Sequence, residues 1–164
     1  MAAHVRKIDV FAGVNALLFL ALCVFRYHAR FVAYRGAAHI EEFVVYAGVI
    51  LAGIVFLWLA FRRHSFDGTI LVLLQVGILM HFSGAFVAID GGRLYDAHLL
   101  GIRYDKYVHL VNAFAVAFLM GKLFRMQGIP LTPLHGVLLL LAVLGLGAVI
   151  EMVEYLVVLT VQNN

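Results

Sequence analysis

Charged side chains are scarce in this sequence. Asp, Glu, Lys and Arg make up 13% of its 164 residues, whereas a soluble domain usually carries about 25%. Apolar residues make up 65% of the chain, so polar side chains are too few to cover the surface of a water-soluble fold. The medium around the chain must itself be apolar, and the sequence predicts an all-α, polytopic transmembrane helix bundle.

Clustered basic charge and paired cysteines are also missing. The formal net charge is +3, but Arg and Lys are scattered in ones and twos, whereas a nucleic-acid surface needs them clustered. We therefore expect no nucleic-acid partner. The single cysteine, Cys23, excludes an internal disulfide and a cysteine-rich metal site, and its apolar surroundings favour a packed thiol.

Five apolar stretches are long enough to cross a bilayer, which takes about 20 mostly apolar residues. They cover residues 8–25, 43–61, 69–89, 107–124 and 134–159. The only two prolines, Pro130 and Pro133, lie in the short link before the last stretch, where a helix must stop. We therefore predict about five spans in a single integral-membrane domain, residues 1–164. The longer links, 26–42 and 90–106, have room for structure of their own, and the first suits a short interfacial helix.

Basic residues are divided equally between the two sides of the predicted bundle, with six on each. Those on the amino-terminal side lie in short links with few acids, which is the setting in which positive charge marks the cytoplasmic side. The sequence thus places the amino terminus in the cytoplasm.

Most acids and histidines fall on one side of the membrane when the five spans alternate in direction. Such side chains are costly inside a bilayer and need a partner, a water-filled cavity or a function. The residues on this side are His28, His39, Glu41, Glu42, His81, Asp90, Asp96, His98, Asp105, His109, Glu151 and Glu154. Their one-sided placement predicts a site at that end of the bundle.

Helical spacing selects five of these residues. Asp105 and His109 are four apart and share one face if their helix has begun by Asp105. Glu151 and Glu154 are three apart, and two carboxylates this close need a cation, a basic partner or a shared proton. His81 has Gly77 and Gly84 on its side of the helix, which permits close approach of another helix.

Two chemical interpretations of these five residues stay open. His81, Asp105, His109, Glu151 and Glu154 are candidate catalytic residues and candidate ligands of a divalent metal ion, with side chains suited to Zn, Mn or Fe. Without a metal, they would act as general acids and bases or relay protons. A structural ion pair explains Asp105 and His109 equally well.

A resemblance adds to this interpretation. The stretches LMHFSGAFVAIDGG, LLGIRYDKYVHLVNAFAVAFLMGKLFR and AVIEMVEYLVVL resemble the YjdF-like family of bacterial inner-membrane proteins and, more remotely, VanZ-like proteins. The resemblance covers roughly the carboxyl-terminal half and implies an inner-membrane location with a polar cluster, but no established activity. The family pattern continues with a further acidic segment and helix, so this chain is expected to be a shortened relative or part of a longer protein.

Two functions of different classes follow. In the first, the chain is a lipid-active or metal-binding membrane enzyme, with Arg103 and Lys106 holding an anionic head group of the substrate. In the second, it is a non-catalytic accessory subunit that packs against larger subunits of a membrane complex, or forms a homo-oligomer, and its acids are neutralised by basic residues. Membrane lipids are expected partners in both.

Overall fold

The computed structural model describes residues 5–89 and 91–162, and the side chains of all of these except 34, 150 and 153–162. Contacts divide the chain into two compact units, Met1–Leu71 and Val72–Asn164, called unit 1 and unit 2 below. Each unit is described by itself, and the single-domain organisation stays a prediction.

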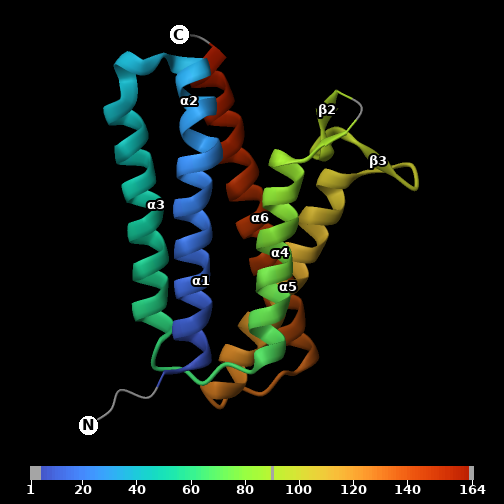
Figure 1. Cartoon of the computed structure of the whole chain (residues 1–164). Helices are drawn as coiled ribbons and strands as arrows, with labels where there is room; N and C mark the ends of the chain where they lie inside the picture. Colours follow the sequence, from blue (N-terminus) through green and yellow to red (C-terminus); the bar gives the residue numbers. More distant parts are fainter. Residues whose placement is uncertain (1–4, 90, 163–164) are drawn as a thin grey trace. The chain divides into compact units, whose positions relative to one another are not determined.

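Unit 1 is a helical hairpin (Figure 1). Helix α1 (Lys7–Leu22) continues through the π-helical turn η1 (Cys23–Tyr27) into α2 (His28–Arg35). Gly36, with φ of +87°, ends this helix, because glycine adopts positive φ without steric cost. The chain then reverses through the 3-10 turn η2 (Ala37–His39) into α3 (Ile40–Phe61).

The first apolar helix is longer than the sequence predicts. Its apolar helical segment runs over Lys7–Ala33, whereas the predicted span stops at residue 25. Arg26 and Arg30 interrupt the apolar run, but both are exposed on the helix surface, and long basic side chains extend toward water from a helix end. The expected interfacial helix in the first link is α2, which continues the span instead of standing apart from it.

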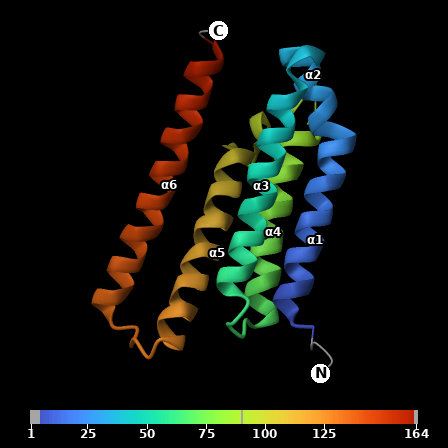
Figure 2. The ribbon, with the colours of Figure 1, turned by 90° about the vertical axis from the view of Figure 1, so that its left-hand side faces the viewer.

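Unit 2 begins within the first turns of α4 (Gly68–Phe86) and contains two long helices beyond it, α5 (Tyr104–Met126) and α6 (Pro133–Gln162). Helices α5 and α6 lie side by side as an antiparallel pair (Figure 2). The two prolines lie at the link between them, as predicted, with Pro133 as the first residue of α6.

Two short β-hairpins separate α4 from α5. Strand β1 (Ala88–Ile89) pairs with β2 (Gly92–Arg93), a 3-10 turn η3 (Leu94–Asp96) follows, and β3 (His98–Leu99) pairs with β4 (Ile102–Arg103). The second hairpin turns at Leu100 and Gly101, both with positive φ, as a two-residue type I′ turn requires. The structure of its own that this link was expected to hold is therefore a pair of hairpins.

Four helical segments are long and apolar enough to cross a membrane. They are Lys7–Ala33, Ala37–Phe61, Gly68–Phe86 and Tyr104–Met126. Helix α6 is the fifth apolar helix, and its part Pro133–Val149 is apolar within the described side chains. The all-α membrane bundle is thereby confirmed, and the third span ends at Phe86 instead of residue 89 because the chain enters β1.

Candidate functional site

His109 lies between two carboxylates that come from different helices. Its Nε2 atom is 3.0 Å from Oδ1 of Asp105, one turn earlier on α5, and 3.4 Å from Oε1 of Glu151 on α6. Asp105 and His109 are four residues apart and lie on one face of the helix, because α5 already begins at Tyr104. We call Asp105, His109 and Glu151 the carboxylate–imidazole cluster.

Two basic side chains compensate Asp105. Arg103 reaches its Oδ2 atom at 2.8 Å, and Lys106 Nζ lies 3.2 Å from the same atom. The hydrogen bond to Asp105 raises the pKa of Arg103 above its ordinary value, so this guanidinium stays charged. The Asp105 side chain is 17% exposed, while those of Arg103 and Lys106 are 49% and 58% exposed, so the cations keep a surface open to other anions.

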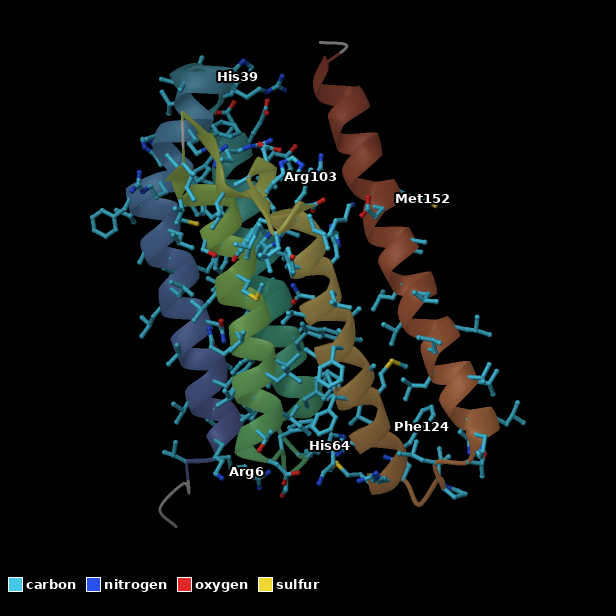
Figure 3. All side chains as sticks on the ribbon, turned by 90° about the vertical axis from the view of Figure 1, so that its right-hand side faces the viewer. Arg6, His39, His64, Arg103, Phe124 and Met152 are labelled. Atoms are coloured by element: carbon cyan, nitrogen blue, oxygen red, sulfur yellow. The ribbon has the colours of Figure 1, made fainter. Side chains whose placement is uncertain are left out.

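The cluster lies toward the hairpin end of unit 2. Arg103, at the junction of β4 and α5, and Met152, next to Glu151 on α6, lie toward the same end, whereas Phe124 lies toward the other (Figure 3). In unit 2, the end of α4 and the part of α6 that carries Glu151 thus lie beside the start of α5, as the order of spans predicts for these residues.

His81 is held by a tyrosine from the first part of the link. The Tyr95 hydroxyl hydrogen-bonds with Nδ1 of His81, and the two rings meet edge to face with centroids 5.7 Å apart. Gly84 makes room for this contact, because a Cβ atom built there would lie 2.9 Å from the Tyr95 ring. His81 therefore has a hydrogen-bonding partner of its own, separate from the three members of the carboxylate–imidazole cluster.

A second glycine of α4 meets α5. A Cβ atom at Gly77 would collide with the Asn112 side chain, and Asn112 donates hydrogen bonds to the carbonyls of Gly77 and Val108 at 3.5 and 2.9 Å. The close helix approach predicted from Gly77 and Gly84 is confirmed at Gly77. Asn112 lies on the same helix as Asp105 and His109, so the contact fixes α5 against α4 below the cluster.

Three tyrosines near the hairpin end of unit 2 have protein partners for their hydroxyls. Besides Tyr95, the Tyr104 hydroxyl lies 3.0 Å from that of Ser83 on α4, and Tyr107 donates to the Leu99 carbonyl at 2.9 Å. The Tyr104 bond joins the start of α5 to the end of α4, and the Tyr107 bond joins α5 to strand β3.

Some predicted residues lie outside what is described. These are the side chain of Glu154, which belongs to α6, and Asp90. Among the described residues, no group of three or more His, Cys, Asp or Glu side chains could hold a metal ion. The metal-site hypothesis for His81, Asp105, His109 and Glu151 therefore gains no support from the part of the chain that the structure covers.

A family model described as "Predicted membrane protein (DUF2238)" matches residues 11–164. The chain belongs to this family. Comparison with curated proteins and with solved structures gives no match.

Membership in the DUF2238 family agrees with the apolar helices and supports an integral membrane protein. The match includes most of unit 1, so family resemblance extends well beyond the carboxyl-terminal half in which the sequence motifs were found. The YjdF-like and VanZ-like relationships stay predictions.

Proposed function

We propose that this protein is a membrane enzyme that moves a proton to or from a membrane-borne substrate with an anionic head group. The observation that carries the proposal is the position of the His109 imidazole between Asp105 and Glu151, at 3.0 and 3.4 Å. Imidazole exchanges protons between pH 5 and 8, and an adjacent carboxylate orients it and stabilises its charged form.

Each residue has a distinct part in this proposal. Both carboxylates approach Nε2 of His109, so Nδ1 takes part in neither contact and is the atom that would face the substrate proton. Asp105, compensated by two cations, orients the ring, and Glu151 provides a second acceptor across the helix pair. Arg103 and Lys106, about half exposed, would attract the head group.

Lipid conversion by the purified full chain tests the proposal. The protein is placed in nanodiscs of bacterial polar lipid extract, and the lipids are compared by liquid chromatography and mass spectrometry before and after incubation. We expect an anionic lipid class to change its mass or its chromatographic retention with the wild-type protein and not with His109→Gln. His135→Gln, the same exchange at the start of α6, is the matched control and should leave conversion unchanged.

Two outcomes contradict the proposal. One is that no lipid changes mass or retention with the wild-type protein, and the other is that His109→Gln converts as much lipid as the wild type. Stoichiometric co-purification with larger subunits after gentle detergent extraction, without lipid conversion, would instead support the accessory-subunit function.

We also propose a bacterial inner-membrane location with the amino-terminal side in the cytoplasm, supported by the short, acid-poor basic links on that side. Five helices then put the carboxyl-terminal end of α6 outside. Alkaline phosphatase fused after residue 164 should be active, since it folds only outside the cytoplasm, and an inactive fusion present at normal levels would contradict this orientation.

A further inference from the structure

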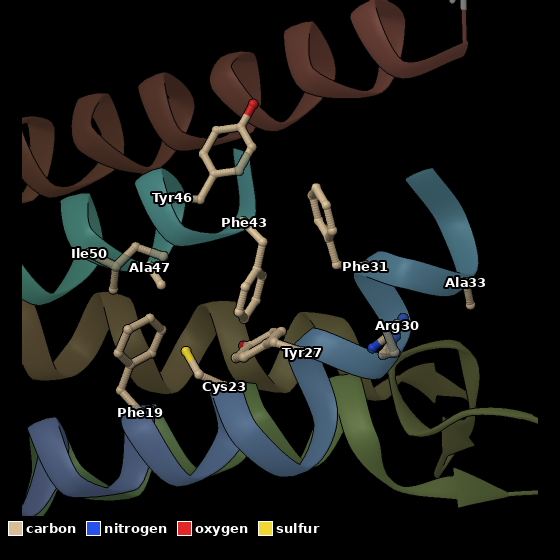
Figure 4. Close-up of a pocket in the computed structure, with 10 residues that line it drawn as sticks. All are labelled: Phe19, Cys23, Tyr27, Arg30, Phe31, Ala33, Phe43, Tyr46, Ala47 and Ile50. Carbon is tan, nitrogen blue, oxygen red and sulfur yellow. The ribbon is translucent and has the colours of Figure 1, made fainter. Parts of the chain in front are cut away.

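Unit 1 contains a groove that the proposed function does not use. It has a volume of about 680 Å³ and lies between the continuous helix α1–η1–α2 and the helix α3 (Figure 4). Binding sites for small molecules commonly measure about 300–1,000 Å³ and have mostly apolar walls. The groove is therefore large enough to hold a ligand.

The π-helical turn shapes one wall of the groove. The backbone N–H of His28 bonds to the carbonyl of Cys23, five residues earlier, which widens the helix at this point. Turns of this kind occur frequently at functional sites. Phe19, Cys23, Tyr27 and Arg30 follow one another along this wall (Figure 4).

Aromatic rings and small side chains complete the lining. Phe19 and Tyr27 have ring centroids 6.3 Å apart, and Phe31 meets Phe43 of α3 at 5.6 Å. Ala47 of α3 also lines the groove, and its small side chain leaves the space between the helices open. Such a surface favours a flexible hydrocarbon chain over a polar ligand.

Charge is placed at one end of the groove only. Arg30 lines it and is exposed, and residues 26–42 contain three arginines against two glutamates. One of these glutamates, Glu42, already pairs with Arg35 at 3.4 Å and with His39 at 3.0 Å. The apolar groove thus ends beside net positive charge, which complements a ligand with an apolar chain and an anionic head.

We propose that the groove binds one acyl chain of an anionic phospholipid, with the lipid phosphate beside Arg30. A phospholipid is the occupant that fits a groove in a membrane-spanning hairpin, because it supplies the hydrocarbon chain and the negative charge in one molecule. The site lies wholly within unit 1 and is independent of the acid–base chemistry proposed for unit 2.

Native mass spectrometry of the detergent-purified full chain tests the site with two probes. Palmitoyl-oleoyl phosphatidylglycerol is anionic, and palmitoyl-oleoyl phosphatidylcholine has the same chains but no net charge. One Arg near an anionic lipid contributes about 1 kcal/mol, or about fivefold in affinity. We expect the wild type to prefer phosphatidylglycerol by about this factor and Arg30→Gln to bind both lipids equally.

Filling the groove should prevent binding of both lipids. Ala47→Trp places a large ring between the helices, and Ile50→Trp does so from a half-exposed position of the rim, where folding is not at risk. Arg63→Gln, beyond the far end of α3, and Val44→Trp change exposed residues outside the lining and should bind like the wild type. Equal wild-type affinity for the two lipids, unchanged binding by Arg30→Gln, or retained binding by folded Ile50→Trp would each overturn the proposal and leave only non-specific lipid around the helices.

Discussion

Units 1 and 2 each hold an aspartate in the first turn of a helix, but the partners differ. Asp9 of α1 accepts hydrogen bonds from the Trp58 indole at 2.8 Å and from the Arg6 backbone at 2.9 Å, with Arg62 at 3.5 Å. Asp105 of α5 has Arg103, Lys106 and His109 around it. The described partners of Asp9 are thus an indole, a backbone amide and a guanidinium, whereas those of Asp105 include an imidazole, the side chain most often used as a general acid or base.

Under the proposed function, this difference separates a structural use of a costly acid from a chemical one. The contacts of Asp9 join the start of α1 to the end of α3 and close unit 1 at that end. The contacts of Asp105 instead lead through His109 to a second acid on another helix. A carboxylate in a membrane helix therefore does not indicate a site unless its partners can change their protonation.

The largest expected effect is on activity and comes from His109. General acid–base groups contribute about 10²-fold to 10⁴-fold in rate, so His109→Gln should reduce lipid conversion at least about 100-fold by the same estimate. Its ion pairs are half exposed and are worth at most about 1 kcal/mol each in stability. The conversion rate and the thermal midpoint, measured on the same preparation, check the expected loss of activity and the expected small loss of stability. A large fall in the midpoint would show that His109 has a structural role like that of Asp9.

The next effect concerns the close packing beside the cluster. Gly84→Ala puts a methyl group against the Tyr95 ring, and overpacking of this kind costs about 1–3 kcal/mol. Denaturant unfolding in detergent measures the loss. Gly145→Ala on α6, where the added Cβ meets nothing within 4 Å, is the control, and equal stability of the two variants would contradict the tight contact of Gly84 with the Tyr95 ring.

A smaller effect is expected at the Asp9 contacts. Trp58→Phe keeps a ring but removes the N–H that Asp9 accepts, so the thermal midpoint should fall by a few degrees while lipid conversion per folded molecule stays unchanged. Trp58 also stacks under Arg62, whose guanidinium carbon lies 4.8 Å from the ring centroid, and phenylalanine retains part of this contact. Loss of lipid conversion in a stable Trp58→Phe variant would contradict a purely structural role of Asp9.

The smallest effect is a gain in stability near the second aspartate. Leu100 has φ of +53° and is 91% exposed. Its backbone conformation is therefore unfavourable for leucine, and its side chain gains no packing that would offset this cost. Asparagine adopts this conformation readily, and Leu100→Asn should stabilise unit 2 by about 1 kcal/mol. Thermal unfolding measures it, with Leu99→Asn, at a neighbouring position in β3, as the control that should not stabilise.

The sequence predicts the helices well because apolar runs of about 20 residues are typical of membrane-spanning helices. It misplaces the end of the first span because Arg26 and Arg30 look like the end of a membrane helix, although their side chains extend outward while the backbone stays helical. The hairpins were missed because strands of two residues carry no periodic pattern.

The site was partly predictable for a similar reason. The pair Asp105 and His109 follows from helical spacing, and the order of spans brings Glu151 to the same end. The partner of His81 does not follow, since Tyr95 lies 14 residues later in the 3-10 turn of the link and meets His81 only because the link folds back. Contacts between residues at helical spacing can be predicted from the sequence, whereas contacts that depend on the fold of an irregular link cannot.

Under the proposed function, Asp9 is structural and the carboxylate–imidazole cluster is catalytic. The most direct measurement is lipid conversion per folded molecule for Asp9→Asn and Glu151→Gln, prepared side by side in the same nanodiscs with their thermal midpoints. We predict that Asp9→Asn lowers the midpoint and retains conversion, and that Glu151→Gln retains the midpoint and loses conversion. The reverse pattern, or the same pattern in both variants, would contradict the claim.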